Sequence, residues 1–309
     1  MPEGDTVWLA SRRMHDALAG RVLERFDLRV PRHATAKLTG RTVVQVLPRG
    51  KHMLTRIDGG VTLHTHFKMD GTWQLGRPGS RWHGPAHQVR AVLANADWEA
   101  VGYRLHDVLL LPTAEEDRVV GHLGPDVLGP DWDPQEAVRR IAEQPDREIG
   151  QALLDQRNLA GVGNLYRTET LFLCGLSPFT PVRAVPHLDR VLATAHRLMR
   201  ANRDHPEQST TGSLRRGETH WVFERPGRDR AAAAAARSRP ASPANPRTSG
   251  SPTGARAASR RSGSPNPDQP VDPADAVRHR GAGGEWAAPT WHREVRCSTC
   301  SSSTPTRMR

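Results

Sequence analysis

The sequence predicts an α+β protein in which one N-terminal helix and a mostly β unit precede an all-helical domain and a disordered tail. Strand-like apolar runs fill the chain up to about Pro112. From Asp133 the apolar residues recur with the period of helices, and after Arg228 large apolar residues nearly vanish while Pro, Ser, Gly and Arg dominate. These changes divide the chain into residues 1–125, 126–223 and 224–309.

The N-terminal helix is predicted over residues 4–20, "GDTVWLASRRMHDALAG". Its apolar residues recur at helical spacing, Gly20 is expected to end it, and Asp5 or Thr6 is expected to cap its start. Pro2 and Glu3 then lie just before a helix N-terminus, where backbone N–H groups and the helix dipole face any anion.

The remaining elements follow from period and turn chemistry. Asp58 to Gly60, "DGG", is predicted as a hairpin turn, and Pro134 is expected at the first position of a helix. A glycine-rich turn, "NLAGVGN", interrupts the helical pattern further on. Strands are expected within residues 21–30, 41–50, 51–57, 61–67, 87–95 and 98–112, and helices within 133–144, 147–176 and 187–204.

Charge and cysteine content limit the function classes. The net charge of +11 favours a polyanionic partner, but residues 229–309 hold 13 Arg and 6 acidic residues, so most of the excess lies in the tail. No apolar run reaches the roughly 18 residues of a membrane span, and the start lacks the pattern of a signal peptide. The 3 cysteines form no disulfide framework. We therefore expect a cytoplasmic protein without a membrane span.

The first residues carry candidate chemistry. Removal of Met1 would leave Pro2 with a free secondary amine, whose pKa of about 7.7–8 keeps a useful fraction neutral at pH 7. Such an amine forms a cationic iminium with an aldehyde-like carbon and thereby drives elimination, and Glu3 beside it can protonate a leaving group. Taken alone, "MPE" is better explained as a frayed chain start, and the catalytic interpretation needs further motifs beside it.

Three further motifs accompany this start: "RGKHML", "THFKMDGTW" and "LLDQRNLAGVGNLYRTETLF". Together with "MPEGD" they resemble the family of formamidopyrimidine-DNA glycosylase and endonuclease VIII, over roughly residues 1–228. The start is more similar to the endonuclease VIII branch than to the oxidised-purine branch. The resemblance implies a β-sandwich behind the N-terminal helix in residues 1–125, and a helix–two-turn–helix domain in residues 126–223.

The resemblance also implies roles for single residues. Pro2 matches the nucleophile that attacks C1′ of a damaged nucleotide, Glu3 the general acid, and Lys51 a β-hairpin lysine that contacts phosphate and supports catalysis. Of the 44 Lys and Arg residues only Lys37, Lys51 and Lys68 are lysines, which favours a need for a compact ammonium group at position 51.

The other matched residues concern DNA. Asn164, with the backbone N–H groups of the "GVGN" turn and the flexibility of Gly163, is expected to hold a phosphate near the lesion; a plain helix-capping turn is the alternative. Met69 matches a wedge that fills the gap left by a flipped nucleotide, and Lys68 beside it would contact phosphate or the orphaned base. A strand-end core residue is the alternative for Met69.

The implied function is that of a bifunctional DNA glycosylase and AP lyase in base excision repair. It would act as a monomer, in the cytoplasm at the nucleoid, on double-stranded DNA with a damaged base or abasic site. Oxidised pyrimidines are the expected substrates, and no cofactor is required for the chemistry. The alternatives are an oxidised-purine glycosylase and a DNA-binding remnant that turns over weakly or not at all.

The resemblance breaks at the C-terminus. The family's zinc finger has four cysteines, whereas this chain places an alanine run at residues 231–236 and offers only Cys297 and Cys300, half of a zinc site. Codons for Cys-Arg-Arg-Cys-Gly become a run of alanine codons when they are read one base later, so we expect a change of reading frame before this run. The alternative is a basic tail that binds DNA nonspecifically. His64 and His66 alternate along one strand without a convincing third metal ligand.

Overall fold

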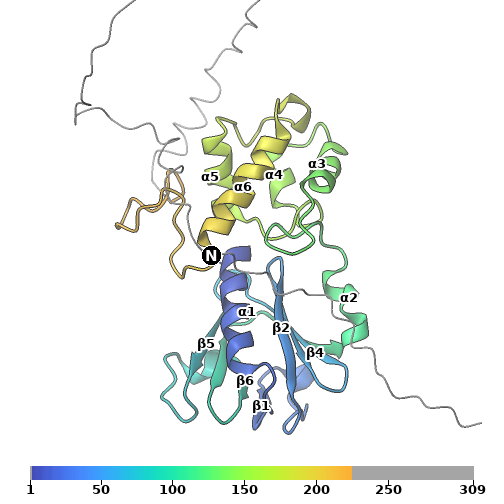
Figure 1. The fold of residues 1–309 in the computed structure, drawn as a ribbon, viewed down its shortest axis with the longest axis vertical. Coiled ribbons are helices and arrows are strands. Elements are labelled where there is room, and N and C mark those ends of the chain that lie inside the picture. Colours follow the sequence, from blue (N-terminus) through green and yellow to red (C-terminus); the bar gives the residue numbers. More distant parts are fainter. Residues whose placement is uncertain (1, 225–309) are drawn as a thin grey trace, which may run out of the picture. The chain divides into compact units, whose positions relative to one another are not determined.

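The computed structural model describes residues 2–224, which form a β-rich part followed by a helical part (Figure 1). The predicted tail after Glu224, with Cys297 and Cys300, lies outside the described residues. An α+β fold is confirmed: two antiparallel four-stranded sheets accompany the N-terminal helix, and helices fill the second half.

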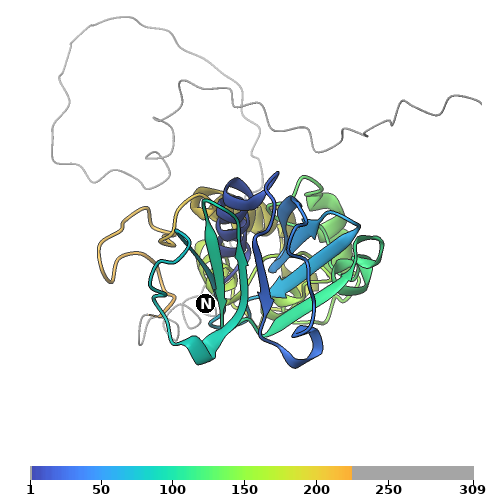
Figure 2. The same cartoon turned by 90° about the horizontal axis from the view of Figure 1, so that it is seen from below.

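The two sheets are formed by strands that are separate in sequence. The first sheet has the strand order β1-β6-β7-β5 and the second has the order β2-β3-β4-β8. Seen from below, the two sheets lie side by side in the β-rich part (Figure 2). The strands are β1 (Arg25–Leu28), β2 (Val43–Arg49), β3 (His52–Ile57), β4 (Val61–His66), β5 (Thr72–Gly76), β6 (Val89–Ala94), β7 (Glu99–Tyr103) and β8 (Asp107–Pro112).

The N-terminal helix α1 (Gly4–Leu18) packs its apolar side into the core of the β-rich part. Val7, Met14 and Leu18 are at most 1 % exposed and lie in one cluster with Met53, Leu63 and other inward-facing strand residues. Fully burying an aliphatic side chain stabilises a fold by about 1.5–3 kcal/mol, so this face fixes α1 against the sheets. The first turn of α1 is thereby held at one end of the β-rich part.

The helical part has its own core. Tyr166, Ile141 and Leu192 are fully buried in a second cluster, against which Trp8 of α1 also packs. Asp133 caps α3 by accepting hydrogen bonds from Gln135 and Glu136, with Pro134 at the first position as predicted. The helices are α2 (Asp117–Val120), α3 (Pro134–Ala142), α4 (Ile149–Leu154), α5 (Asn164–Leu173) and α6 (Leu188–Asn202), with short 3-10 turns at Pro31–His33, Ala86–Gln88, Thr113–Glu115 and Val182–Ala184.

Most predicted elements are present, and the differences have local causes. The hairpin turn at Asp58 to Gly60 joins β3 and β4, with Gly59 and Gly60 at positive φ. Strand β5 was not predicted, because its short apolar pattern lies between "DG" and the Gly- and Pro-rich run after Gly76. The prediction that Asp5 or Thr6 caps α1 is wrong, because the helix begins at Gly4 and Glu3 is the N-cap residue.

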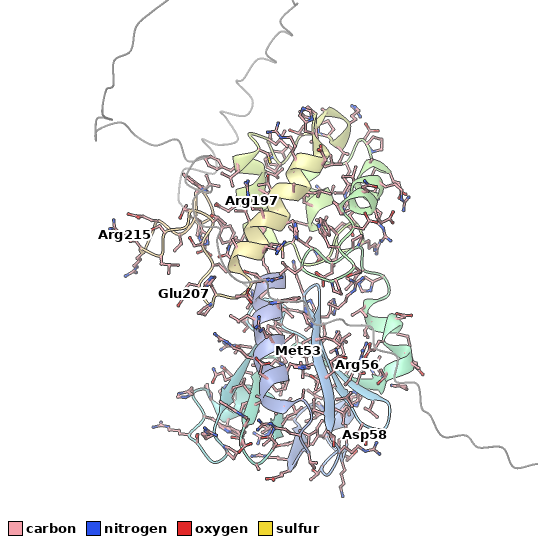
Figure 3. All side chains as sticks on the ribbon, viewed as in Figure 1. Met53, Arg56, Asp58, Arg197, Glu207 and Arg215 are labelled. Atoms are coloured by element: carbon pink, nitrogen blue, oxygen red, sulfur yellow. The ribbon has the colours of Figure 1, made fainter. Side chains whose placement is uncertain are left out.

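Arginines are spread over both parts of the fold. Figure 3 labels three of them: Arg56 on β3, Arg197 on α6 and Arg215 on the segment that follows α6. No helix among residues 2–224 is long and apolar enough to cross a membrane.

Candidate active site

The carboxylate of Glu3 lies fully buried at the junction of the β-rich and helical parts. Its Oε2 accepts a hydrogen bond from Gly163 N at 2.7 Å and its Oε1 accepts one from Leu165 N at 2.7 Å. Tyr166 N donates to Oε2 at 3.4 Å. Glu3 therefore caps the N-terminus of α5 from a distant part of the chain, which explains why its side chain does not cap its own helix.

Two glycines allow this close approach. A Cβ on Gly163 would lie 2.4 Å from Glu3 Cδ, so only hydrogen fits between the backbone and the carboxyl group. Gly4 N donates to Gly161 O at 2.9 Å, and a Cβ on Gly4 would meet the methyl group of Met199 at 2.8 Å. The first turn of α1 and the glycine-rich turn before α5 thus lie in direct contact.

Burial dominates the electrostatics of Glu3. Burial raises the pKa of Glu3 above its ordinary value, and the charge of Asp5 adds to that rise. The Lys51 ammonium group and the backbone N–H donors act in the opposite direction but do not outweigh burial. A carboxyl group with a raised pKa holds its proton at a higher pH than an ordinary carboxyl group does.

Lys51 lies at the turn between β2 and β3, where its charge interacts with that of Glu3. Burial lowers the pKa of Lys51, and the Glu3 carboxylate partly offsets this effect. The turn is fixed from the other side of the junction, because Gly50 N donates to Asp126 Oδ2 at 2.6 Å. Gly50 has φ +58, and a Cβ there would lie 2.9 Å from Ala160 Cβ. The structure therefore brings Lys51 and Glu3 close enough for their charges to interact.

Pro2 is half-buried and directly precedes Glu3. The structure thus places the predicted nucleophile, general acid and lysine in one region, formed by the start of α1, the β2–β3 turn and the N-terminus of α5.

A second buried carboxylate, Asp5, lies on the same turn and was assigned only a capping role from sequence. The Tyr166 hydroxyl donates to Asp5 Oδ2 at 2.6 Å, and Gln208 Nε2 donates to both carboxylate oxygens at 2.9 Å. Burial raises the pKa of Asp5, although these hydrogen bonds oppose the rise. Burial likewise raises the pKa of Tyr166, so its hydroxyl stays protonated as a donor.

The "GVGN" turn differs in one respect from its predicted role. Gly161 N donates to Gln156 Oε1 at 2.9 Å and Gly163 N donates to Glu3, so these two N–H groups are not offered to a phosphate. The predicted phosphate contact can therefore use only the other N–H groups of this turn, and it stays a prediction. The half-exposed side chain of Asn164, at the first position of α5, stays a predicted phosphate contact.

The loop after β4 holds the predicted wedge. Met69 is 66 % exposed, so the alternative of a strand-end core residue is wrong. Lys68 adopts φ 51, its backbone N–H donates to His66 Nδ1 at 3.1 Å, and its Nζ lies 3.2 Å from Asp107 Oδ1. Its ammonium group is thus engaged with a carboxylate, whereas Met69 projects into solvent.

A histidine cluster lies next to Lys51. His52 Nδ1 and His64 Nε2 are 2.8 Å apart, and the rings of His66 and His122 approach His52 edge-on. Burial, together with the neighbouring charges, lowers the pKa of His52 to about 3 and that of His66 to about 4, so both rings are neutral at pH 7. Within residues 2–224 no group of three or more His, Cys, Asp or Glu side chains is placed to hold a metal ion.

The cysteines of the chain do not fit the four-cysteine zinc site that the sequence resemblance implies. Cys174 is the cysteine that the described part contains, and it lies alone beside Thr194. Cys297 and Cys300 supply two thiolates, which is half of a tetrahedral set.

Several site residues were missed by sequence reasoning. Asp126, Tyr166 and Gln208 act through buried hydrogen bonds between segments far apart in the chain, and no local motif signals such contacts. Gly50 had a usable signal, because a glycine between two strand patterns indicates a turn with positive φ.

Comparison with known proteins identifies the family. The formamidopyrimidine-DNA glycosylase N-terminal domain matches residues 1–124, and the formamidopyrimidine-DNA glycosylase H2TH domain matches residues 123–210. "Probable endonuclease 8 2" of Streptomyces coelicolor is 58% identical over 228 residues, which cover 73% of this chain and 82% of the relative. "DNA-(apurinic or apyrimidinic site) lyase Nei2" of Mycolicibacterium smegmatis is 42% identical, covering 74% of this chain and 88% of the relative.

Solved structures share the fold. The formamidopyrimidine DNA glycosylase of Lactococcus lactis, bound noncovalently to DNA with an AP site, matches with a TM-score of 0.58 at 19% identity, over 65% of this chain and 81% of that chain. A MutM complex with DNA containing carbocyclic 8-oxo-G matches with a TM-score of 0.59 at 19% identity, over 69% of this chain and 85% of that chain. Taken with the two family matches, these findings show that the chain belongs to the formamidopyrimidine-DNA glycosylase family.

Proposed function

We propose that this protein is a bifunctional DNA glycosylase and AP lyase that removes oxidised bases, chiefly pyrimidines, from double-stranded DNA. Relatives named as an endonuclease 8 and as a DNA-(apurinic or apyrimidinic site) lyase support this class of activity. The observation that carries the proposal is the fully buried Glu3 carboxyl group, held against α5 directly after Pro2 and beside the charge of Lys51.

The chemistry begins at Pro2. Once Met1 has been removed, the neutral secondary amine attacks C1′ of the flipped nucleotide, an N–C1′ bond forms, and the bond to the base breaks. Glu3 supplies the proton that the departing base needs. Opening of the sugar gives an iminium between Pro2 and C1′, which acts as an electron sink.

The same iminium then cleaves the backbone. Loss of a proton from C2′ allows the C3′–O bond to break in β-elimination, and a further elimination breaks the C5′–O bond. Each elimination releases one end of the cut DNA strand, which carries the phosphate. Hydrolysis of the final adduct then frees the amine of Pro2. We assign to Lys51 the stabilisation of the negative charge that builds up on the leaving phosphates, because an ammonium group beside such a phosphate stabilises that charge.

DNA contacts complete the proposal. Asn164 would contact a phosphate at the start of α5, and Met69 would insert where the flipped nucleotide leaves the stack. Lys68 would give up its contact with Asp107 to reach the phosphate or the orphaned base. A chain in which these contacts persist without turnover would be a DNA-binding remnant.

A duplex panel tests the proposal. Purified protein is incubated with duplexes that carry thymine glycol, dihydrouracil, oxidised guanine or an abasic site, and strand cleavage is followed on a gel. We expect excision of the pyrimidine lesions and cleavage at the abasic site. Glu3→Gln should lower excision by about a hundredfold while abasic cleavage falls much less. Binding without cleavage of any duplex would favour the remnant, and preferred excision of oxidised guanine would favour a purine substrate.

A further inference from the structure

Met69, the proposed wedge, lies on a short loop that is anchored at both of its ends. Phe67 is buried in the core at the end of β4, and Gly71 N donates to Phe67 O at 2.9 Å. A Cβ on Gly71 would lie 2.6 Å from Phe67 O and 3.1 Å from Arg104 O. The loop of residues 67–71 is therefore closed on itself and lies directly against residues 104–106, the turn between β7 and β8.

Asp70 joins this loop to the β7–β8 turn through its side chain and its backbone. Its Oδ1 accepts a hydrogen bond from His106 Nε2 at 2.8 Å, and its Oδ2 lies 3.1 Å from Arg104 Nε. Arg104 Nε also donates to Asp70 O at 3.1 Å. The turn is itself held in place, because Arg104 N donates to Gln88 O at 2.9 Å and Arg104 Nη1 donates to Gln88 Oε1 at 3.0 Å. Both carboxylate oxygens of Asp70 are thus engaged by one fixed turn.

The backbone on both sides of this contact is strained. Lys68 has φ 51 and Arg104 has φ 47, in the left-handed region that residues other than glycine rarely adopt. Such strain persists only where surrounding contacts hold it, and it is common at sites where the conformation serves a function. The contacts of Asp70 supply this restraint, and the loop conformation that they hold is the one that exposes Met69.

Lys68, on the other side of Met69, is held more weakly. Within residues 2–224 its ammonium group has one ion pair, with Asp107 Oδ1 at 3.2 Å, and both side chains are nearly half exposed. A single exposed ion pair contributes little to stability, so a DNA phosphate can replace it. The loop should therefore remain docked at Asp70 when Lys68 turns to the DNA.

We propose that Asp70 is a positioning residue for the wedge: its contacts with Arg104 and His106 hold the loop of residues 67–71 so that Met69 is presented to the DNA before binding. This inference depends on the proposed function. A side chain that is already in the inserting conformation loses little conformational freedom when it enters the base stack. Because Asp70 acts through Met69, its role is confined to substrates in which a base must leave a stack.

The first test compares Asp70→Ala with Asp97→Ala. Both aspartates are exposed on the β-rich part and ion-paired with an arginine, and both substitutions remove one negative charge. Loss of a negative charge alone favours DNA binding, whereas a misplaced wedge slows excision, so the two effects have opposite signs. We expect Asp70→Ala to lower single-turnover excision of thymine glycol from duplex DNA by about fivefold, and excision from single-stranded DNA by less than about twofold. Asp97→Ala should leave both rates within about twofold of wild type.

A double variant tests whether Asp70 acts through Met69. Asp70→Ala is introduced into Met69→Ala, in which no wedge remains to be positioned. We expect the second substitution to lower duplex excision by less than about twofold in this background, against about fivefold in the wild type. Equal losses in the two backgrounds would show that Asp70 affects excision by another route and would overturn the inference.

Amide hydrogen exchange tests the loop without DNA. The Lys68 N–H donates to His66 Nδ1 and the Gly71 N–H donates to Phe67 O, so both amides are protected from exchange while the loop is docked. Asp70→Ala should accelerate exchange at both amides by about tenfold, and Asp97→Ala should leave it unchanged.

The outcomes separate the positioning role from the function beneath it. Wild-type duplex excision by Asp70→Ala, equal losses on duplex and single-stranded DNA, or unchanged exchange in the loop would each overturn the role of Asp70. Failure of the wild type to excise any lesion would instead overturn the proposed function, and the exchange rates would still show whether Asp70 holds the loop. Should Asp70→Ala not fold, His106→Ala removes the donor to Oδ1 and should lower duplex excision by about twofold and accelerate the same exchange; no change in either would overturn the inference.

Discussion

Glu3 Oε1 accepts a hydrogen bond from Leu165 N at 2.7 Å, across 162 positions of sequence. This contact joins the start of the first helix to the start of α5 and places one buried carboxyl group between the two parts of the fold. The turn that carries Glu3 is therefore held by both parts, and changes on either side of the junction should alter the proposed catalysis.

Gly163→Ala tests the close approach of Glu3. Its φ of −125° suits any residue, so the substitution carries no backbone penalty, and its Cβ would lie 2.4 Å from Glu3 Cδ. We expect a destabilisation of about 1–3 kcal/mol and a loss of base excision larger than the loss of abasic cleavage. Gly76→Ala is the control, because a Cβ there meets nothing within 4 Å. Chemical denaturation measures the loss of stability, and the duplex assay measures the loss of base excision. Equal stability and equal excision rates of Gly163→Ala and Gly76→Ala would contradict the close approach of Glu3 to Gly163.

Asp126→Ala tests the support of the Lys51 turn. Removing this carboxylate leaves the buried N–H groups of Gly50 and Leu128 without an acceptor, which costs about 1–3 kcal/mol. Lys51 should then be misplaced and abasic cleavage should fall. Asp133→Ala, which removes the cap of α3, should cost about 1 kcal/mol and leave cleavage rates unchanged. Unaltered cleavage by Asp126→Ala would show that the turn holds Lys51 without this contact.

Glu116→Gln tests a pH-dependent contribution to stability. Burial opposes ionisation of Glu116, but the hydrogen bonds of Arg56 and Thr62 outweigh it and leave its pKa below the ordinary 4.5. A lowered carboxyl pKa stabilises the fold above the ordinary value, and this contribution is lost as pH falls through the folded-state pKa. The variant should be less stable by about 1–2 kcal/mol at pH 7, with a gap that closes below pH 4.5. A gap independent of pH in denaturant titrations would contradict this assignment.

Met69→Ala tests the wedge. Met69 is 66 % exposed on the loop after β4, so its removal should leave stability within about 0.5 kcal/mol of wild type. Excision from duplex DNA should fall by about tenfold, because the gap in the stack is no longer filled, while excision from single-stranded DNA should change little. Leu214→Ala, at a residue with 67 % exposure, is the control and should leave both rates unchanged. Equal losses on both substrates would exclude a wedge.

The sequence was sufficient for the fold class, because the elements of the fold follow from local signals. The helical period of α1, the "DGG" hairpin and the Asp133–Pro134 start of α3 each lie within a few residues. The network of Asp5, Tyr166 and Gln208 was not predictable, because it joins residues 161 and 203 positions apart. For the same reason the "GVGN" turn was assigned to phosphate when one of its N–H groups in fact holds Glu3.

Borohydride trapping on abasic DNA, followed by peptide mapping of the adduct, tests the central claim most directly. The amines available for an iminium are those of Lys37, Lys51, Lys68 and the chain start. The account predicts a mature protein without Met1 and an adduct on Pro2, lost in Pro2→Gly. Met1 retained in a protein that is still trapped, or an adduct mapped to one of the lysines, would contradict it.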